Sequence, residues 1–541
     1  MEGCSSDFNR ALAIVRNAKL PHPDGQLLES FLAYDHGYSS SYMLSKCSTS
    51  VDMAAFLSDW KELIAMFFCE DPIRQVLDKR IVADIKRRDG GRCCITGLGN
   101  SFLDPLVVVP IFLGIGSRID VSLHEMLGAF LGPELRDWVL AGTASQTIHR
   151  NCWLVRKSAA TAWSQGFFEF SFSKSSECFV AATIIRGPGL PPIAEKLLSL
   201  RYTSLKDHSA SGMDTPDVFA LKVISRFAKA IRWSCVAREI AQKISRAPSK
   251  PYPTSRQRFL FTERLTTALL VAWRRVPTSL RIQAYRALAI LGAYIYGSNC
   301  SMKVQQLPFG MYLKSTSTEW HEGLANEYGA LELVRSHTHI PVPRPLDLVS
   351  NSRDSYLLTS RVPGHRLGAC IDALDDQEAS TLIRDLQRCL VELRAIPKTC
   401  APEYAITNAL GNACYDHRIN AALNYDEDRG DFVGPFVDEE EFNKTLRCGA
   451  LPDVVHRSGH KIVFTHGDLN MRNVLVHNGR FSGIVDWENS GWYPDYWDYT
   501  KAHFVTKLKW RWLNMVDDAC KELGDFEDAL QTERQLWQYC F

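Results

Sequence analysis

Three polar residues in the segment 464–488 have the types and the spacing of a phosphoryl-transfer site. Asp468 is followed five residues later by Asn473 and, thirteen residues after that, by Asp486. Phosphoryl transfer from a metal-bound triphosphate needs a carboxylate that orients the acceptor hydroxyl and takes its proton, together with oxygen ligands for magnesium. We therefore predict Asp468 as the catalytic base, and Asn473 and Asp486 as the ligands of Mg²⁺.

The surrounding residues predict how the chain brings these three together. Short runs of β-branched or aromatic residues predict three strands, at 462–465, 474–476 and 481–485. The pair Asn478-Gly479 favours a hairpin turn between the last two strands. The loop ahead of this hairpin then contains Asp468 and Asn473, and Asp486 ends its second strand.

The stretch 464–476, with 481–488, resembles the catalytic segment of the aminoglycoside phosphotransferase and choline kinase-like family, in particular of the large group of fungal proteins in that family. Protein kinases have the same Asp-x-x-x-x-Asn spacing, but with His-Arg-Asp in place of His-Gly-Asp. Further segments resemble the family in the same order along the chain, at 307–314, 326–331, 338–345, 356–364 and 492–501. The resemblance covers about half the chain.

The resemblance implies an α+β architecture in which residues 263–541 form a bilobal protein kinase-like fold, with a small β-rich lobe and a larger α-rich lobe. It implies that Lys314, on a strand at the start of the domain, contacts the phosphates of ATP and is held by Glu327 on a helix. It also places Ser360 and Val362 in the hinge, where adenine would bond to the backbone.

The remaining residues of the predicted site have supporting roles. His466 is expected to pack and hydrogen-bond the catalytic loop, whereas Glu488 either braces that loop or contacts the metal. No glycine-rich phosphate loop precedes the strand of the lysine, so Ser298, Asn299 and Ser301 are expected to cover the phosphates.

These features together predict an ATP- and Mg²⁺-dependent phosphotransferase that acts on a hydroxyl group of a small molecule. A nucleotide-binding pseudokinase with a regulatory role is the alternative.

Apolar spacing over 378–393 predicts a core helix of the larger lobe. Acidic residues at 426–431 and 438–441 predict either a carboxylate rim for a cationic acceptor or a solvated loop.

The N-terminal half carries a second resemblance. The segment 81–97 is similar to the opening of fungal HNH-nuclease-like domains, which implies a separate α+β domain at 1–247 with its core at about 75–175. Where such domains have histidines, this chain has Val108 and Ala160, which can neither bind a metal nor activate water. The domain is therefore expected to be degenerate and without nuclease activity.

Three alternatives remain open for this half. The N-terminal half could instead be an unrelated α+β domain, an active nuclease that uses His124 and His149, or a nucleic-acid-binding module. In the last case a basic face would contact phosphates through Lys79, Arg80, Lys86, Arg87, Arg88 and Arg92. Composition does not favour nucleic acid as a partner, because 62 Lys and Arg against 61 Asp and Glu give a net charge of only +1.

Amino-acid composition and proline-rich segments indicate the class of protein and its domain boundaries. Its 541 residues, 46% of them hydrophobic, suffice for two or three domains. Sixteen cysteines without paired spacing favour reduced thiols in an intracellular, cytoplasmic protein. Neither a leader peptide nor a membrane span is predicted. A helix is predicted at 219–244, followed by a proline-rich linker at 248–262.

Overall fold

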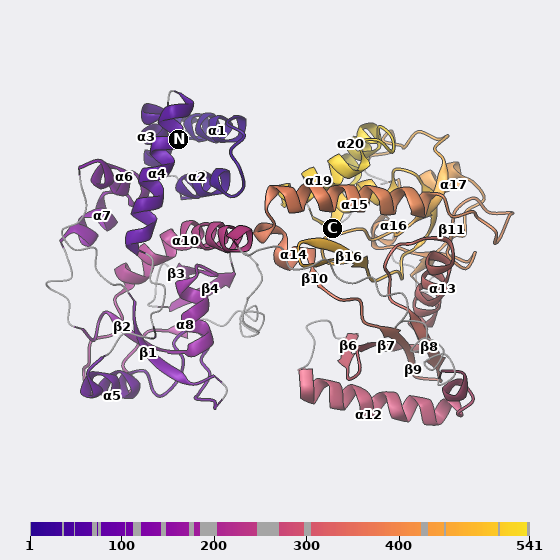
Figure 1. The fold of residues 1–541 in the computed structure, drawn as a ribbon, viewed down its shortest axis with the longest axis horizontal. Helices are drawn as coiled ribbons and strands as arrows, with labels where there is room; N and C mark the ends of the chain where they lie inside the picture. The colour runs from indigo at the N-terminus through magenta and orange to yellow at the C-terminus, as the bar shows by residue number, and fades with distance from the viewer. Residues whose placement is uncertain are drawn as a thin grey trace. The chain divides into compact units, whose positions relative to one another are not determined.

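The computed structural model describes residues 2–34, 37–47, 49–67, 73, 77–102, 104–111, 121–141, 148–172, 178–183, 203–245, 270–296, 304–422, 431–447, 451–506 and 509–537. The chain divides into two compact units, Met1–Ser249 and Lys250–Phe541, each of which is described by itself (Figure 1). The predicted linker at 248–262 and the phosphate-covering residues Ser298, Asn299 and Ser301 lie outside the described residues.

The unit Met1–Ser249 mixes helices with short antiparallel strands. Its helices are α1 (Glu2–Asn17), α2 (Asp24–Leu32), α3 (Tyr38–Lys46), α4 (Ser50–Phe67), α5 (Lys79–Arg88), α6 (Val121–Leu131), α7 (Pro133–Leu140), α8 (Lys157–Ser164) and α10 (Val218–Ser245). Its strands are β1 (Leu106–Pro110), β2 (Cys152–Arg156), β3 (Phe168–Phe172), β4 (Cys178–Thr183) and β5 (Thr203–Ser204). Strand β1 pairs with β2, and β4 lies between β3 and β5.

Helix α10 is central to the core of this unit and confirms the helix predicted at 219–244. The ring of Phe227 lies 3.9 Å from that of Phe67 and 4.8 Å from that of Phe130, measured between centroids. Buried aromatic rings contribute much of the apolar area of a core. The apolar stripe of α10 therefore holds α4 and α6 together.

Arg88 does not belong to an exposed basic face, as the nucleic-acid alternative required. Its side chain is fully buried, and it donates to the carboxylate of Asp89 at 2.7 and 3.0 Å. It also donates to the carbonyls of His149, Cys152 and Asp214. A guanidinium engaged in this way has no donors left for a nucleic-acid phosphate, so the prediction for Arg88 is wrong. The other basic residues are exposed: Lys79, Arg80, Lys86, Arg87 and Arg92.

The small lobe of the unit Lys250–Phe541 is a four-stranded antiparallel sheet with helices packed on it. Its strands are β6 (Val304–Leu307), β7 (Met311–Ser317), β8 (Pro345–Ser350) and β9 (Asp354–Ser360), in the order β6-β7-β9-β8. Its helices are α12 (Thr278–Tyr296), the short 3-10 helix η4 (Thr318–Trp320) and α13 (His321–His337). The predicted strand at 307–314 is in fact a hairpin, because Phe309 and Gly310 have positive φ angles of 63° and 68° and reverse the chain. Lys314 therefore lies on β7.

The large lobe is mostly helical. Its helices are α14 (Leu367–Cys370), η5 (Ile371–Ala373), α15 (Asp376–Arg394), α16 (His417–Ala422), α17 (Glu439–Thr445), α18 (Trp497–Val505), α19 (Trp510–Cys520) and α20 (Glu527–Leu536). Its strands are β10 (His365–Arg366), β11 (Thr407–Asn408), β12 (Cys414–Tyr415), β13 (Phe432–Val433), β14 (Ile462–Thr465), β15 (Val474–His477), β16 (Arg480–Ile484) and β17 (Gly491–Pro494). They form the sheets β10-β15-β16, β11-β17-β14 and β12-β13.

Two local predictions for this lobe are confirmed. Asn478 and Gly479, with φ angles of 51° and 71°, join β15 to β16 in a tight hairpin. The helix predicted at 378–393 is α15, which begins with a capping box between Asp375 and Glu378. Its apolar stripe is buried in the lobe's core, at Leu382, Leu386, Leu390 and Leu393.

Ten of the cysteines that the structure describes take part in no disulfide. Eight of them are buried, namely Cys47, Cys93, Cys152 and Cys235 in the first unit and Cys370, Cys389, Cys414 and Cys520 in the second, whereas Cys94 and Cys400 are half-buried. Burial raises their pKa where a shift is resolved, for example to about 11 at Cys152 and about 12 at Cys389.

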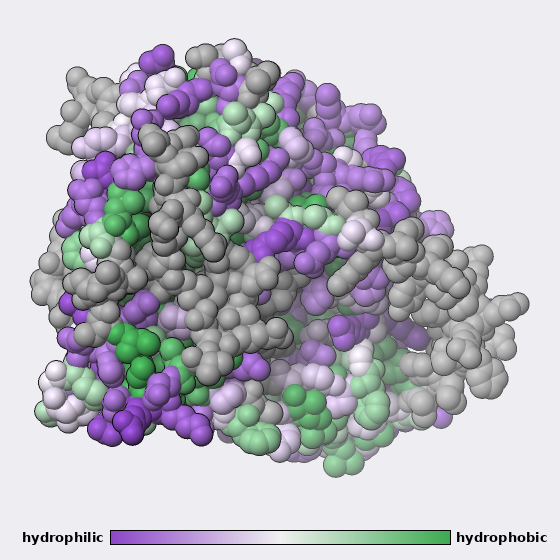
Figure 2. Space-filling view, turned by 60° about the vertical axis from the view of Figure 1, so that its left-hand side comes forward, coloured by the Kyte–Doolittle hydropathy of each residue, from purple (hydrophilic) through white to green (hydrophobic). Residues whose placement is uncertain are grey.

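The surface drawn in Figure 2 alternates between hydrophilic side chains (purple) and smaller hydrophobic areas (green). Among the described residues, no helix combines the length and the apolar character needed to cross a membrane.

Candidate active site

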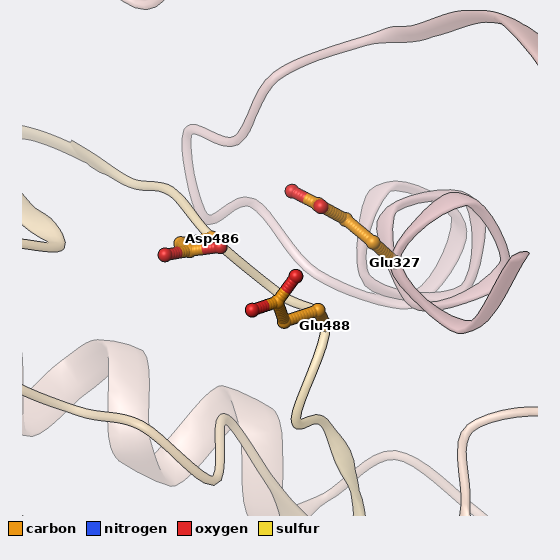
Figure 3. Close-up of side chains that lie close together, drawn as sticks. All are labelled: Glu327, Asp486 and Glu488. Carbon is orange, nitrogen blue, oxygen red and sulfur yellow. The ribbon is translucent and has the colours of Figure 1, made fainter. Parts of the chain in front are cut away.

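Lys314 lies among three carboxylates. Its Nζ is 2.8 Å from Oε2 of Glu327 on α13, 2.6 Å from Oδ1 of Asp486 and 2.7 Å from Oε2 of Glu488. Figure 3 shows Glu327 reaching from its helix toward Asp486 and Glu488, which lie on the segment that follows β16. The fold thus brings together the predicted lysine and glutamate pair with one predicted metal ligand and with Glu488.

The charges in this cluster shift one another's protonation. Burial disfavours the ammonium of Lys314, but Asp486, Glu327 and Glu488 outweigh it and raise its pKa well above the ordinary value. Burial raises the pKa of Glu327 to about 7, with Lys314 acting in the opposite direction. Burial would also raise the pKa of Asp486, but the nearby Lys314 outweighs it, and that pKa is lowered. Lys314 therefore favours the anionic form of Asp486.

Asp468 and Asn473 lie together in the loop between β14 and β15. The amide Nδ2 of Asn473 donates to the backbone carbonyl and to the carboxylate Oδ2 of Asp468, both at 2.9 Å. Burial raises the pKa of Asp468, although Lys501 and His466 act against it. A raised pKa makes a carboxylate a better proton acceptor, which suits a general base.

His466 links this loop to the segment that carries Asp486. Its Nδ1 accepts a hydrogen bond from the amide of Asp468 at 3.2 Å, and its Nε2 donates to the carbonyl of Val485 at 3.1 Å. Its ring also packs edge-on against Trp487, with centroids 4.6 Å apart. Both ring nitrogens therefore form hydrogen bonds with backbone groups, which is the supporting role expected of this residue.

Asp498, near the start of α18, anchors the same loop from the other side. Its carboxylate accepts hydrogen bonds from the backbone amides of His466 at 3.1 Å and of Gly467 at 2.9 Å. Gly467 has a φ of 77°, and a Cβ at this position would lie 2.2 Å from the carbonyl oxygen of Asn489. The glycine of the His-Gly-Asp sequence is therefore required by close backbone packing.

A pocket of about 230 Å³ gathers most of the predicted site. The residues predicted to bind the nucleotide line it, namely Lys314, Glu327, Ser360 and Val362. The predicted metal ligands Asn473 and Asp486 line it as well. Asp468 is joined to this group through its bonds with Asn473. The walls also include apolar side chains and two basic ones, among them Leu357, Leu475, Val485, Arg366 and Arg472.

Three further residues beside the predicted site were assigned no role from the sequence. These are Asp498, Asn326 on α13, and Lys501, whose Nζ lies 2.7 Å from Oδ1 of the buried Asp416. Asp498 and Lys501 fall in the segment 492–501, and Asn326 directly precedes Glu327. These residues could have been noticed because they lie in segments that resemble the family. Their spacing in the sequence does not identify the groups that they bind.

Part of the acidic stretch at 438–441 serves the fold, whereas Asp438, Glu440 and Glu441 remain exposed. Asp438 is the N-cap of α17 and accepts from the amide of Glu441 at 2.8 Å, and Glu441 accepts from the amide of Val437 just before the helix at 2.8 Å. Glu439 is buried and lies 2.6 Å from Nδ1 of His460. Most of the other acidic stretch lies outside the described residues, at 426–430.

Part of the chain is similar to known proteins. Residues 304–537 match the phosphotransferase enzyme family (APH). An aminoglycoside 3'-phosphotransferase of Enterococcus faecalis is 28% identical over 167 residues, which cover 28% of this chain and 56% of that protein. The chain thus spans little more than half the length of this relative.

Two solved structures are similar to part of the chain. The crystal structure of an aminoglycoside-3'-phosphotransferase of type VIII is 18% identical, with a TM-score of 0.32, over 44% of this chain and 88% of that one. The GDP and kanamycin complex of APH(2")-IIia is 20% identical, with a TM-score of 0.32, over 43% and 78%. The match over residues 304–537 is the finding that classifies this region. The C-terminal part of the chain carries a domain of the phosphotransferase enzyme family.

Proposed function

We propose that this chain is an ATP- and magnesium-dependent phosphotransferase that acts on a hydroxyl group of a small molecule. The observation that carries the proposal is the pocket in which Lys314, paired with Glu327 at 2.8 Å, faces Asp486 at 2.6 Å. An ammonium held by a helix carboxylate is suited to the phosphates of a nucleotide. The hinge residues Ser360 and Val362, which line the same pocket, would bond the base.

The residues present fit a magnesium ion. The Nδ2 of Asn473 is directed at Asp468, so its amide oxygen points away from that residue, and Asp486 has its pKa lowered. An amide oxygen and an anionic carboxylate are the hard ligands that magnesium prefers. When bound there, the ion would neutralise charge on the phosphate oxygens. Glu488, which shares the carboxylate cluster, either braces the lysine or joins the metal site.

Asp468 would act on the acceptor. Its carboxylate would orient the acceptor hydroxyl and take its proton as the oxygen attacks the terminal phosphorus, while ADP leaves with the electron pair of the broken bond. Asn473 fixes one carboxylate oxygen of Asp468, so the other is the atom that would receive the proton. Lys314 would hold the phosphates in place during transfer.

Magnesium-dependent binding of ATP tests this function. Mg-ATP at 100 times its Kd should stabilise the wild-type protein by about 2.7 kcal/mol in a thermal or chemical unfolding experiment. Asp486→Ala should lose the magnesium-dependent part of this effect, whereas the exposed control Asp453→Ala should keep it. A wild-type protein that saturating Mg-ATP does not stabilise would contradict the proposal. Binding without transfer, in a screen of amine, alcohol and sugar acceptors with ATP and GTP, would favour the pseudokinase alternative.

For the first unit we propose a degenerate HNH-nuclease-like domain without nuclease activity; nucleic-acid binding through its exposed basic residues is the alternative. Ala160 is fully buried in α8, and Val108 lies on β1, so neither position offers a metal ligand. His149 lies 3.6 Å from Asp84, and His124 lies on the separate helix α6. The free buried thiols of both units support an intracellular, cytoplasmic location.

A further inference from the structure

Asn326 ties helix α13 of the small lobe to two segments of the large lobe. Its Nδ2 donates to the carbonyls of Glu488 and Ser490, both at 2.9 Å, and its Oδ1 accepts from the amide of Ala409 at 2.8 Å. The residue is 3% exposed. An amide side chain has two N–H donors and one carbonyl acceptor, and all three groups are used here.

The partners of Asn326 belong to the active-site segment itself. Glu488, whose carbonyl it binds, also contacts Lys314 through its carboxylate at 2.7 Å. Glu327, the next residue on α13, contacts the same Nζ at 2.8 Å. One buried side chain therefore fixes the distance between the helix that carries Glu327 and the segment that carries Asp486 and Glu488.

The same face of α13 is buried in a core that both lobes share. Ala330, Leu331 and Val334 pack in one cluster with Phe464, Ile484, Trp487 and Trp492 of the large lobe. One turn after Asn326, Gly329 allows close packing, since a Cβ there would lie 2.5 Å from Cδ2 of Leu410. Apolar packing presses the helix against the large lobe, and Asn326 supplies directional bonds that set its position along that surface.

We propose that Asn326 is the positioning residue of the phosphate-binding site: it holds α13 on the large lobe so that Glu327 stays paired with Lys314. In this role it touches neither nucleotide nor acceptor. The proposal rests on the proposed function for its effect on nucleotide binding, but the coupling of α13 to the segment 486–490 stands on geometry alone.

The test compares two buried asparagines of the same domain. Asn443 on α17 is 2% exposed, and its Nδ2 also donates to backbone carbonyls, those of His456 and Arg457. Asn326→Ala and Asn443→Ala each remove such an amide. For both variants and the full-length wild type, three quantities are measured: urea unfolding, hydrogen exchange of the backbone over residues 321–337, and the Kd for Mg-ATP.

Asn326→Ala should speed amide exchange across α13 by tenfold or more and weaken Mg-ATP binding by about the same factor. Asn443→Ala should lose stability but leave both properties at wild-type values. If Asn326→Ala does not fold, Asn326→Ser, which keeps one donor, should show the same changes to a smaller degree. An Asn326 variant with lowered stability but unchanged exchange in α13 would overturn the proposal. If wild type itself fails to bind Mg-ATP, the proposed function is lost, and the exchange measurement alone decides the role of Asn326.

Discussion

Asn473 donates to two oxygens of Asp468, the backbone carbonyl and carboxylate Oδ2, each at 2.9 Å. The bond to the carboxylate fixes its rotation, and the bond to the carbonyl fixes the loop. One residue that is expected to bind the metal therefore also orients the residue that is expected to take the proton. A substitution of Asn473 that removes its amide should therefore disturb both residues, whereas a substitution of Asp468 that keeps an acceptor oxygen can preserve this link.

Asp468→Asn should abolish most turnover while leaving nucleotide binding intact. The new amide can still present its oxygen to Nδ2 of Asn473, so the loop keeps its shape, but the amide cannot take a proton. Turnover on any accepted substrate should fall by about two to four orders of magnitude, the scale expected for loss of a general base. Steady-state kinetics and Mg-ATP titration of the same preparation measure the two effects. Unchanged turnover would show that Asp468 is not the base.

Lys314→Met should weaken both nucleotide binding and turnover. Removing the ammonium leaves Glu327, Asp486 and Glu488 without their shared counter-charge, in a site where they would meet the phosphates of the nucleotide. The lysine is expected to contact the phosphates before and during transfer, so the Kd for Mg-ATP should rise and kcat should fall. If Lys314→Met and Asp468→Asn lose nucleotide affinity and turnover to the same extent, the two roles are assigned wrongly.

Gly467→Ala should destabilise the catalytic loop far more than an ordinary glycine substitution. Both Gly467 and Gly310 have positive φ, but a Cβ at Gly310 meets nothing within 4 Å, whereas at Gly467 it lies 2.2 Å from a backbone oxygen. Gly310→Ala should cost only the backbone strain of about 1–2 kcal/mol. Gly467→Ala should cost about 1–3 kcal/mol more for the overpacking. Urea unfolding of the two variants measures this difference; equal losses would contradict it.

Glu533 should make the second unit sensitive to acid. Its carboxylate is 1% exposed and is bound by Arg418 at 2.6 and 3.0 Å and by His456 at 2.7 Å. Burial would raise its pKa, but Arg418 and His456 together outweigh this and lower it from 4.5 to about 2. Because the folded-state pKa is depressed, this stabilisation is present above pH 4.5 and is lost as the pH falls toward 2.

Glu533→Gln tests this contribution. At pH 7 it should cost about 3–5 kcal/mol, since it leaves Arg418 buried without a counter-charge. The free energy of unfolding of the variant should also change less than that of the wild type between pH 4.5 and 2. Glu527→Gln, at an exposed position of the same helix, is the control and should behave like wild type. A Glu533→Gln protein with the wild-type pH dependence would show that the pKa of Glu533 is not depressed.

The full-length protein should not cleave DNA with magnesium, manganese, zinc or nickel ions. Val108 and Ala160 offer no ligand atoms at the positions where a nuclease-like domain would need histidines. Incubation of plasmid DNA with purified protein and each metal checks this. Cleavage that survives repurification and disappears in His124→Ala or His149→Ala would refute the expectation.

The local sequence was enough to predict those elements whose structure depends on residues that are neighbours in the chain. The turn at Asn478-Gly479 follows from their tolerance of positive φ, and α15 from its apolar spacing and capping residues. The grouping of Lys314 with Glu327 and Asp486 could be expected only from the resemblance to a family. No local pattern joins residues that are 172 positions apart, as Lys314 and Asp486 are.

Other features depend on contacts that no local pattern encodes. Arg88 stands on a strongly basic helix, yet its partners include carbonyls 61 and 126 positions along the chain, and these bonds bury it. Glu439 belongs to an acidic stretch in sequence, yet it is buried and accepts hydrogen bonds from the amides of Gly459 and His460, 20 and 21 positions along the chain. In each case the polar side chain satisfies backbone groups whose positions are set by the tertiary structure.

The buried free thiols provide a way to follow the opening of each unit separately. A cysteine that is inaccessible in the folded state reacts with an alkylating reagent only when its surroundings open, so its labelling rate reports local unfolding. Cys152 and Cys235 would report on the first unit, and Cys389 and Cys520 on the second. Mass spectrometry of the labelled peptides would then give two stability profiles from one intact chain, and would reveal whether adding Mg-ATP protects only the unit that carries Lys314.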